Sequence, residues 1–253
     1  MIIAGDLHGR SDLAKKIVGE FKREKLVFTG DYVDSFHRPD SDITDTLKIV
    51  LDSPALFIVG NHEFNYYGPF AEHLAGYPGH GCCSGFRQSL LIPVGAVLKE
   101  HKKRFRLAYQ LSGVLITHAG ITTGWIEHKR RENDMLELKD IIRFLETADP
   151  FSLDMHDSVF AAGYRGGLDV ACIQAGPLWC DYNHEFVNMP VEGLNQVFGH
   201  THVSRIKKVD YDKSHNFNVD CLESGGNQVL EITGPEDNPK FRVIDLSSRQ
   251  TWT

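Results

Sequence analysis

The sequence is poor in three features that would each point to a particular class of protein: paired cysteines, long apolar runs and an excess of positive charge. Its five cysteines form no C-x-x-C pair, so free thiols in a reducing compartment are expected rather than a thiolate metal site. No apolar run approaches the ~20 residues that a membrane span needs. The formal net charge is −7, which suits non-specific nucleic-acid binding poorly, because phosphate backbones are held mainly by Lys and Arg.

The length and composition are ordinary for one globular domain. At 253 residues, with 42% hydrophobic and 24% charged residues, the chain fits a single large α/β domain. We expect one domain over residues 1–253, with insertions at about 65–104 and 121–195. Because Asp6 already belongs to the first motif described below, no signal peptide is indicated, and the expected location is the cytoplasm.

Several apolar stretches end in the same way, in a turn that is followed at once by Asp, Asn or His. The clearest is residues 26–34, in which a β-type run is followed by Gly30 and then by Asp31 and Asp34. Ligands of open α/β sheets bind at the carboxyl ends of the strands, so these side chains are expected to converge. Their types favour a metal site with nitrogen and oxygen ligands. The other four stretches deliver Asp6 and His8, Asn61 and His62, His118, and His200 and His202.

Apolar spacing predicts alternating strands and helices in the first quarter of the chain. Strands are expected at 1–5, 26–29 and 55–59, with helices that begin at Ser11 and near Ile43. A β-α-β-α-β order implies parallel strands that are joined by right-handed crossovers.

The rest of the chain is predicted to add helices, a hairpin and further strands. Residues 86–103 can be helical, with Pro93 as a break or kink, and another helix is expected from Met135 to Leu145. Residues 105–117 are typical of a hairpin. The expected fold class is α/β (α+β), a two-sheet sandwich with helices outside. The second, mostly antiparallel sheet is suggested by short strands near 206–209, 217–219, 229–232 and 241–244.

The side chains at the strand ends suit two metal ions. Asp6 and His8 are two residues apart, as are His200 and His202, so each pair can reach one ion from an extended turn. Asp31 follows the central strand and is the natural bridge between two ions.

Asn61 and His118 add a neutral oxygen and another imidazole to this set. The set is too large for one tetrahedral zinc ion, but it fits two octahedral-leaning ions that share a carboxylate. Two metals about 3.5–4 Å apart can clamp the attacking and leaving oxygens of a displacement at phosphorus. The sequence therefore predicts a site for chemistry on a phosphate ester.

Two further residues at the strand ends are candidates for catalysis. His62 follows Asn61 directly, so its side chain should point differently while it stays at the site. Asp34, three residues beyond Asp31, can accept a hydrogen bond from His62, orient it and favour its charged form. A protonated His62 can donate to the leaving alkoxide, an effect typically worth ~10²–10⁴-fold in rate.

Five short motifs follow one another along the chain: G-D-L-H-G, G-D-Y-V-D, G-N-H-E, T-H-A-G and G-H-T-H. With them the sequence resembles the calcineurin-like metallophosphoesterase superfamily. The first four are closest to its phosphoprotein phosphatase branch, which includes bacterial and phage-type Ser/Thr phosphatases and bacterial diadenosine tetraphosphate hydrolases. Residues 177–181 are similar to the L-W-S-D segment of that branch. The resemblance extends from Asp6 to about Gly226, and five ordered motifs are far more specific than any one.

The resemblance implies a ligand set for each of two divalent metal ions. Asp31 would bridge the ions, which are expected to be manganese, with iron or zinc as alternatives. His62 would be the general acid, paired with Asp34. The first ion would be held by Asp6, His8 and His202, and the second by Asn61, His118 and His200.

The sequence departs from the branch at phosphate-binding arginines. The usual motifs G-D-x-V-D-R-G and R-G-N-H-E have Ser35 and Val59 here at the arginine positions. An arginine fork binds a dianionic phosphate better than a lone charge does, so its absence leaves room for a phosphodiester or nucleotide substrate. Arg38, Arg87 and Arg165 are the candidates to replace it.

Three functions are compatible with this sequence. The first is a dinuclear, Ser/Thr phosphatase-like hydrolase of phosphate monoesters, in which a hydroxide that bridges the metals attacks and His62 is the general acid. The second is a phosphodiesterase or dinucleoside polyphosphate hydrolase, which the missing arginines favour. The third is a non-enzymatic binding module, which would be expected to have lost ligands that are all present here. The expected partner is a phosphorylated substrate, either a phosphoprotein or a nucleotide.

Overall fold

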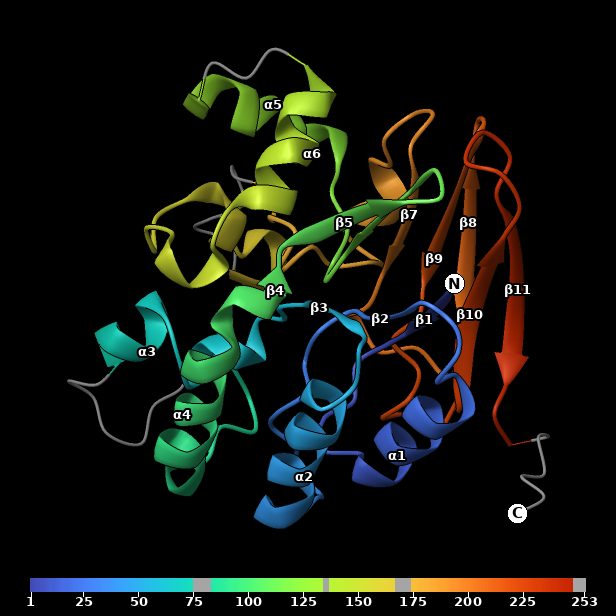
Figure 1. Cartoon of the computed structure of the whole chain (residues 1–253). Coiled ribbons are helices and arrows are strands. Elements are labelled where there is room, and N and C mark those ends of the chain that lie inside the picture. Colours follow the sequence, from blue (N-terminus) through green and yellow to red (C-terminus); the bar gives the residue numbers. More distant parts are fainter. Residues whose placement is uncertain (75–82, 134–136, 167–173, 248–253) are drawn as a thin grey trace.

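Two β-sheets lie face to face in the protein, and helices pack on their outer sides (Figure 1). The structure is a computed structural model, and it describes residues 1–74, 83–133, 137–166 and 174–247. Among these residues, one sheet has six strands and the other has five.

The first sheet has the strand order β11-β10-β1-β2-β3-β4. Strands β1 to β4 are parallel, whereas β10 and β11 are antiparallel to their neighbours. The parallel part comes from the alternating strands and helices at the start of the chain, as their spacing predicts. The strands are β1 (Ile2–Ala4), β2 (Leu26–Phe28), β3 (Leu56–Ile58), β4 (Phe105–Arg106), β10 (Gln228–Thr233) and β11 (Lys240–Asp245).

The second sheet has the order β5-β6-β7-β9-β8. Its two outer pairs are antiparallel, and its two inner pairs are parallel. Strands β6 and β7 are neighbours, so the turns that follow them lie side by side. The strands are β5 (Ala108–Leu111), β6 (Val114–Thr117), β7 (Asn195–Phe198), β8 (Lys207–Tyr211) and β9 (Ser214–Asn218).

Six α-helices are present among the described residues, and none of their helices is long and apolar enough to cross a membrane. Pro93 is the third residue of α4, where a proline is tolerated because the amides of a first turn have no partner within the helix. The α-helices are α1 (Ser11–Glu20), α2 (Asp40–Leu51), α3 (Pro69–Leu74), α4 (Leu91–His101), α5 (Thr123–Asn133) and α6 (Leu138–Thr147). Short 3₁₀ turns lie at His62–Asn65, Gln88–Leu90, Lys102–Arg104, Pro150–Ser152, Ser158–Phe160, Gly163–Gly166 and Phe186–Asn188.

The strands of the first sheet contribute to two separate cores, because successive side chains point to opposite faces. Ile3 and Val27 pack between the sheets with Val197 of the second sheet. Phe28 and Phe57 point to the other face, into the core beneath the helices. Both faces of the first sheet are thus buried, which explains its near-continuous apolar runs.

The predicted two-sheet sandwich with outer helices is confirmed, but one part of the strand assignment is wrong. The last two strands, β10 and β11, do not join the second sheet; β10 pairs with β1, and β11 pairs with β10. The second sheet is also mixed rather than mostly antiparallel. Long-range pairing of this kind leaves no local pattern in the sequence.

The helical predictions differ from the structure in detail. Pro93 lies in the first turn of α4, so it neither breaks nor kinks the helix. The sequence pattern does not predict helix α5, in which five of the eleven residues are charged, and Met135 lies outside the described residues. The regions expected to be insertions contain α3 and α4, and α5 and α6.

We expect Phe57→Ala to lower the free energy of unfolding by about 3–5 kcal/mol, the usual cost of removing a buried Phe side chain. Phe57 is fully buried, with its ring parallel to that of Phe28 and close to that of Phe105. Urea unfolding followed by circular dichroism measures the change. Phe36→Ala is the matched control, because Phe36 is 69% exposed and its loss should change stability by no more than about 0.5 kcal/mol. Equal effects of the two substitutions would contradict the packing described here.

Candidate metal centre

The turns after five strands bring candidate site residues together from both sheets. These strands are β1, β2 and β3 of the first sheet and β6 and β7 of the second. Asp31, after β2, lies in the middle of the group. Its Oδ2 is 3.6 Å from Nε2 of His8, 3.9 Å from Nε2 of His62 and 3.5 Å from Nε2 of His118. The carboxylate of Asp31 therefore faces histidines from the first sheet and from the second.

Several of these residues have a backbone conformation that non-glycine residues rarely adopt. The φ angle is +42° at His8, +48° at Asp31, +60° at Asp34 and +70° at His200. Such a conformation costs of order 1–3 kcal/mol and persists only where the surrounding structure fixes it, which is common at functional sites. The turns are thus held in shape for the side chains that they carry.

Two glycines leave space for carboxylates of the centre. A Cβ atom on Gly60 would lie 2.1 Å from Oδ1 of Asp31 and 2.5 Å from its backbone nitrogen. A Cβ atom on Gly199 would lie 2.1 Å from Oδ1 of Asp6. The glycine at the end of β3 and the one at the end of β7 are therefore required by the side chains of neighbouring turns.

Asn61, His118 and His200 form one half of the centre together with Asp31. Oδ1 of Asn61 is 2.8 Å from Nε2 of His118 and 2.9 Å from Nδ1 of His200. Nδ1 of His118 donates to the carbonyl of Thr29 at 2.9 Å, so in the neutral ring Nε2 carries the lone pair. The lone pair on Nε2 of His118 thus points at Oδ1 of Asn61, as donor atoms do around a cation. Nε2 of His200 is buried and has no hydrogen-bond partner in the part of the chain that the structure describes.

Asp6 lies beside this group and is fully buried. Its Oδ1 accepts a hydrogen bond from the Thr29 hydroxyl at 2.8 Å, and its Oδ2 accepts one from the backbone N–H of His200 at 2.7 Å. Asp6 is not among the three groups of metal-ligating side chains whose ligand atoms lie within 4.8 Å of one another. Those groups are Asp31, His118 and His200; His8, Asp31 and His62; and His8, His202 and Glu223.

His8 and His202 complete the other half of the centre. Nδ1 of His8 is 3.2 Å from the carbonyl oxygens of Val33 and Asp34, which leaves Nε2 to face Asp31. The ring of His202 lies 5.6 Å from that of His8, and its side chain is half exposed. All seven predicted ligands are therefore in one region, with Asp6 the most enclosed and His202 the most open.

The charges of the centre lack compensation by basic residues. Burial raises the pKa of Asp6 and that of Asp31 well above the usual range, and other carboxylates nearby raise them further. Burial lowers the pKa of His118 to about 3 and keeps the pKa values of His8 and His200 well below the usual one. No Lys or Arg within the described ranges lies at ion-pair distance from Asp6 or Asp31. Buried carboxylates beside neutral imidazoles fit divalent cations, which would supply the missing positive charge.

Asp34 and His62 are brought together as predicted. Oδ2 of Asp34 lies 2.9 Å from Nδ1 of His62 and accepts a further hydrogen bond from Nδ2 of Asn65 at 2.6 Å. The Tyr66 hydroxyl donates to Oδ1 of Asp34. The carboxylate is thus fixed on both oxygens, and it directs Nε2 of His62 toward Asp31.

The three arginines proposed to replace the missing ones lie in different surroundings. The guanidinium of Arg38 is 3.9 Å from Asp12 and 3.8 Å from Asp42, near the starts of α1 and α2. The guanidinium of Arg87 donates to Asp40 and to the carbonyl of Ser35, both at 2.6 Å, so it supports a loop.

Arg165 is the arginine that adjoins the metal centre. It donates to Oδ2 of Asp181 at 3.2 Å and to the hydroxyl of Thr201 at 3.0 Å, and Thr201 lies between two predicted ligands. Its charge also contributes to the lowered pKa of His118 and of His200. Of the arginines singled out in the sequence, Arg165 is therefore the one brought to the site.

Several residues around the centre had no assigned role in the sequence motifs. Glu63 accepts hydrogen bonds from the backbone amides of Gly60, Asp31 and Tyr32, and it ties the turns after β2 and β3 together. Nδ2 of Asn61 donates to the thiol of Cys83 at 3.1 Å. Glu63 belongs to the G-N-H-E motif, whereas Glu223 lies outside the five motifs, and the contacts of both side chains depend on the folded structure.

A small pocket of about 70 Å³ opens onto this region. Its walls include His8, Asp34, His62 and His202, and the exposed Phe36 lies at its rim. The pocket is therefore lined by two of the predicted metal ligands, His8 and His202, and by both candidate catalytic residues, Asp34 and His62.

The family model for calcineurin-like phosphoesterases matches residues 1–204. The chain belongs to this family. It is therefore a metal-dependent phosphoester hydrolase, and its buried Asp and His groups are the candidates to bind the metal. The comparison with curated proteins gives no match.

Solved structures share the fold of this phosphoesterase. The cold-active protein-tyrosine phosphatase of a psychrophilic Shewanella species has a TM-score of 0.55 and 16% sequence identity, and the match covers 95% of this chain and 79% of that one. A predicted phosphoesterase from Streptococcus pneumoniae has a TM-score of 0.34 and 12% identity, and the match covers 97% of this chain and 88% of that one, but this TM-score is too low to indicate a shared fold. At 16% identity, the likeness to the Shewanella phosphatase concerns the fold alone.

We expect Gly60→Ala to lower the hydrolase activity of this phosphoesterase at least about 10-fold, as misplacing a reacting group by about 1 Å can cost ~10²-fold. The new methyl group would collide with the carboxylate and the backbone of Asp31. Gly19→Ala is the matched control, because Gly19 lies in α1 with no atom within 4 Å of the added Cβ. That control should keep full activity and gain up to about 1 kcal/mol in stability. Full activity of Gly60→Ala would show that Asp31 does not need this space.

Proposed function

We propose that this phosphoesterase hydrolyses phosphate monoesters with two divalent cations, in the manner of the Ser/Thr phosphatases of the phosphoprotein phosphatase branch. The observation that carries the proposal is the position of Asp31, whose Oδ2 lies between His8 and His62 on one side and His118 on the other. Asp31 belongs to two of the metal-ligating groups, so one carboxylate can serve two ions. Manganese is the first candidate, with iron and zinc as alternatives.

In this proposal the ligands divide as the sequence predicts. Asp31 would contact both ions. When bound, the two cations would supply the positive charge that activates water and offsets the charge of the phosphate. The first ion would be held by Asp6, His8 and His202, and the second by Asn61, His118 and His200.

His62 is the proposed proton donor to the leaving group. Its Nδ1 is 2.9 Å from Oδ2 of Asp34, a contact that orients the ring, and its Nε2 points toward Asp31. A side chain that is held by a carboxylate on one nitrogen can give the proton on the other, and it is recharged from solvent because His62 is partly exposed. Asp34 acts through His62 as a positioning residue.

Arg165 is the proposed ligand of the phosphate oxygens. Asp181 and Thr201 fix its guanidinium, and NH1 has no hydrogen bond within the described residues. A guanidinium oriented in advance loses less entropy when it binds a phosphate. Arg38 is the weaker candidate, because its charge faces Asp12 and Asp42.

The second candidate function is hydrolysis of phosphodiesters or dinucleoside polyphosphates. The observation that favours it is the use of Ser35 and Val59 where the branch carries arginines. Ser35 lines the pocket beside His62 but carries no charge, and its hydroxyl oxygen accepts hydrogen bonds from the amides of His37 and Arg38. Val59 is fully buried, so neither residue offers a positive charge to a substrate. A phosphate with less charge depends less on such arginines.

Two broader expectations stay predictions. One is a single domain over residues 1–253, with insertions at about 65–104 and 121–195. The other is a cytoplasmic location, which is supported by the free thiols of Cys180 and Cys221.

We expect chelator-stripped protein that is reloaded with Mn²⁺ to hydrolyse p-nitrophenyl phosphate faster than bis-p-nitrophenyl phosphate. Asp31→Asn should abolish both activities, because it removes the charge that two ions would share. Rates of the two substrates, measured on the same preparations, give the ratio directly. Faster hydrolysis of the diester would favour the second candidate function, and full activity of Asp31→Asn with Mn²⁺ present would contradict both.

We expect Arg165→Ala to lower kcat/KM for the preferred substrate about 10- to 100-fold, the usual effect of losing a hydrogen bond to a charged group. Arg165→Lys should recover part of this, because it keeps the charge and loses the planar fork. Arg131→Ala is the control, since that side chain is 77% exposed and pairs only with Glu127 among the described residues. If Arg165→Ala and Arg131→Ala have the same kcat/KM, Arg165 does not bind the substrate.

A further inference from the structure

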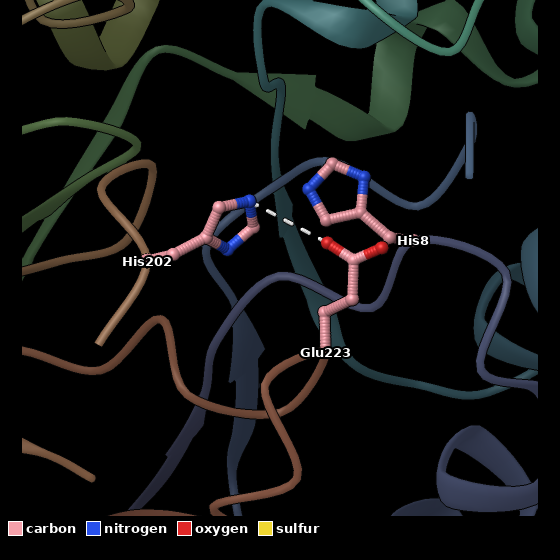
Figure 2. A group of neighbouring side chains, drawn as sticks. All are labelled: His8, His202 and Glu223. Atoms are coloured by element: carbon pink, nitrogen blue, oxygen red, sulfur yellow. Dashed lines mark ion pairs between the residues drawn. The ribbon is translucent and has the colours of Figure 1, made fainter. Parts of the chain in front are cut away.

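One of the metal-ligating groups contains a residue that the sequence motifs do not include. His8 follows β1, His202 follows β7, and Glu223 follows β9, so three distant segments meet here. Their ligand atoms lie within 4.8 Å of one another. Figure 2 shows the carboxylate of Glu223 directed at the ring of His202, with the ring of His8 beside them. Nε2 of His202 is 3.5 Å from Oε2 of Glu223.

We propose that Glu223 is a further ligand of the cation that His8 and His202 hold. This inference rests on the proposed function, because it concerns one of the two cations in that proposal. It adds a carboxylate at the open side of the centre, where the pocket meets solvent.

The orientation of the two imidazoles supports this assignment. Nδ1 of His8 faces backbone carbonyl oxygens, so its Nε2 carries the lone pair. Nδ1 of His202 is 3.2 Å from Oδ2 of Asp220, so its Nε2 is the nitrogen on the side of Glu223. Metal-ligating histidines usually give their other nitrogen to a carboxylate or a carbonyl in this way.

The burial of Asp220 is a second observation that points to a cation. Asp220 is fully buried, and its Oδ1 has no hydrogen-bond partner within the described residues. Its Oδ2 contacts Nδ1 of His202, and a buried carboxylate is costly unless positive charge lies nearby. An ion held by His8, His202 and Glu223 would supply that charge, with Asp220 positioning His202.

A simple ion pair between Glu223 and a charged His202 is the competing explanation. It accounts for the 3.5 Å contact and for positive charge beside Asp220, but it does not explain why a ring nitrogen of His8 lies within 4.8 Å of the ligand atoms of His202 and Glu223. The two explanations differ in what Glu223→Gln does to metal binding. An ion pair predicts no loss of metal affinity, whereas a lost ligand weakens one ion about 10- to 100-fold, the range typical even for groups that only support a ligand.

The test is Mn²⁺ titration of the chelator-stripped full chain by isothermal titration calorimetry. The intact protein should bind two ions, and Glu223→Gln should bind one of them about 10- to 100-fold more weakly, while the other keeps its affinity. Glu223→Asp should recover part of the affinity, because it restores the charge on a shorter side chain. Glu236→Gln, at an exposed site in the loop between β10 and β11, is the control that should match the intact protein.

A second readout does not depend on calorimetry or on activity. A cation that binds only the folded state raises the melting temperature, so Mn²⁺ should stabilise Glu223→Gln less than it stabilises Glu236→Gln. Equal melting temperatures without metal would show that both variants fold. Two ions bound by Glu223→Gln with unchanged affinities would overturn the role of Glu223 alone. No binding to the intact protein would overturn the proposed function as well.

Discussion

The carboxylate of Asp31 is the point at which the two sheets and the chemistry of the site depend on one another. Its Oδ1 accepts the backbone amide of His62, and its own amide donates to Glu63, so the turns after β2 and β3 are tied together. Its Oδ2 faces His118 of the second sheet at 3.5 Å. The left-handed backbone of Asp31 and the missing side chain of Gly60 are the conditions for this arrangement. Cation binding would therefore also join the two sheets.

The residues at the ends of strands can be predicted from the sequence, whereas contacts between distant segments cannot. The turns that carry Asp6, Asp31 and His118 each follow an apolar strand, and a strand end is a local signal. The pairing of β10 with β1 is a contact across most of the chain, and nothing within either strand specifies it. Glu223 illustrates the same limit, because it becomes a neighbour of His8 only after β7 and β9 have been placed. Arg165 was one of three equivalent candidates until Asp181 and Thr201 fixed it beside the centre.

This phosphoesterase has a negative net charge, although the substrates of a phosphoesterase are anions. Its net charge is −7, Asp34 and Glu223 line the pocket at the metal centre, and Asp6, Asp31 and Asp220 are buried. Without bound cations such a pocket would repel its substrate. Arg165 supplies one fixed positive charge, and the cations would have to supply most of the rest. Metal loading is then a condition for substrate binding as well as for the reaction.

The position of β1 between β2 and β10 affects how the protein can fold during synthesis. The second neighbour of β1 is β10, and the amino group of Met1 donates to the carbonyl of Ile232 at 3.0 Å. During synthesis β1 therefore emerges long before β10, and the edge of β1 that faces β10 is unpaired until then. The strand before Asp6 and His8 gains its second neighbour only after β10 has left the ribosome. A nascent or shortened chain without β10 would contain all five motifs, but β1, which precedes Asp6 and His8, would lack one of its two neighbouring strands.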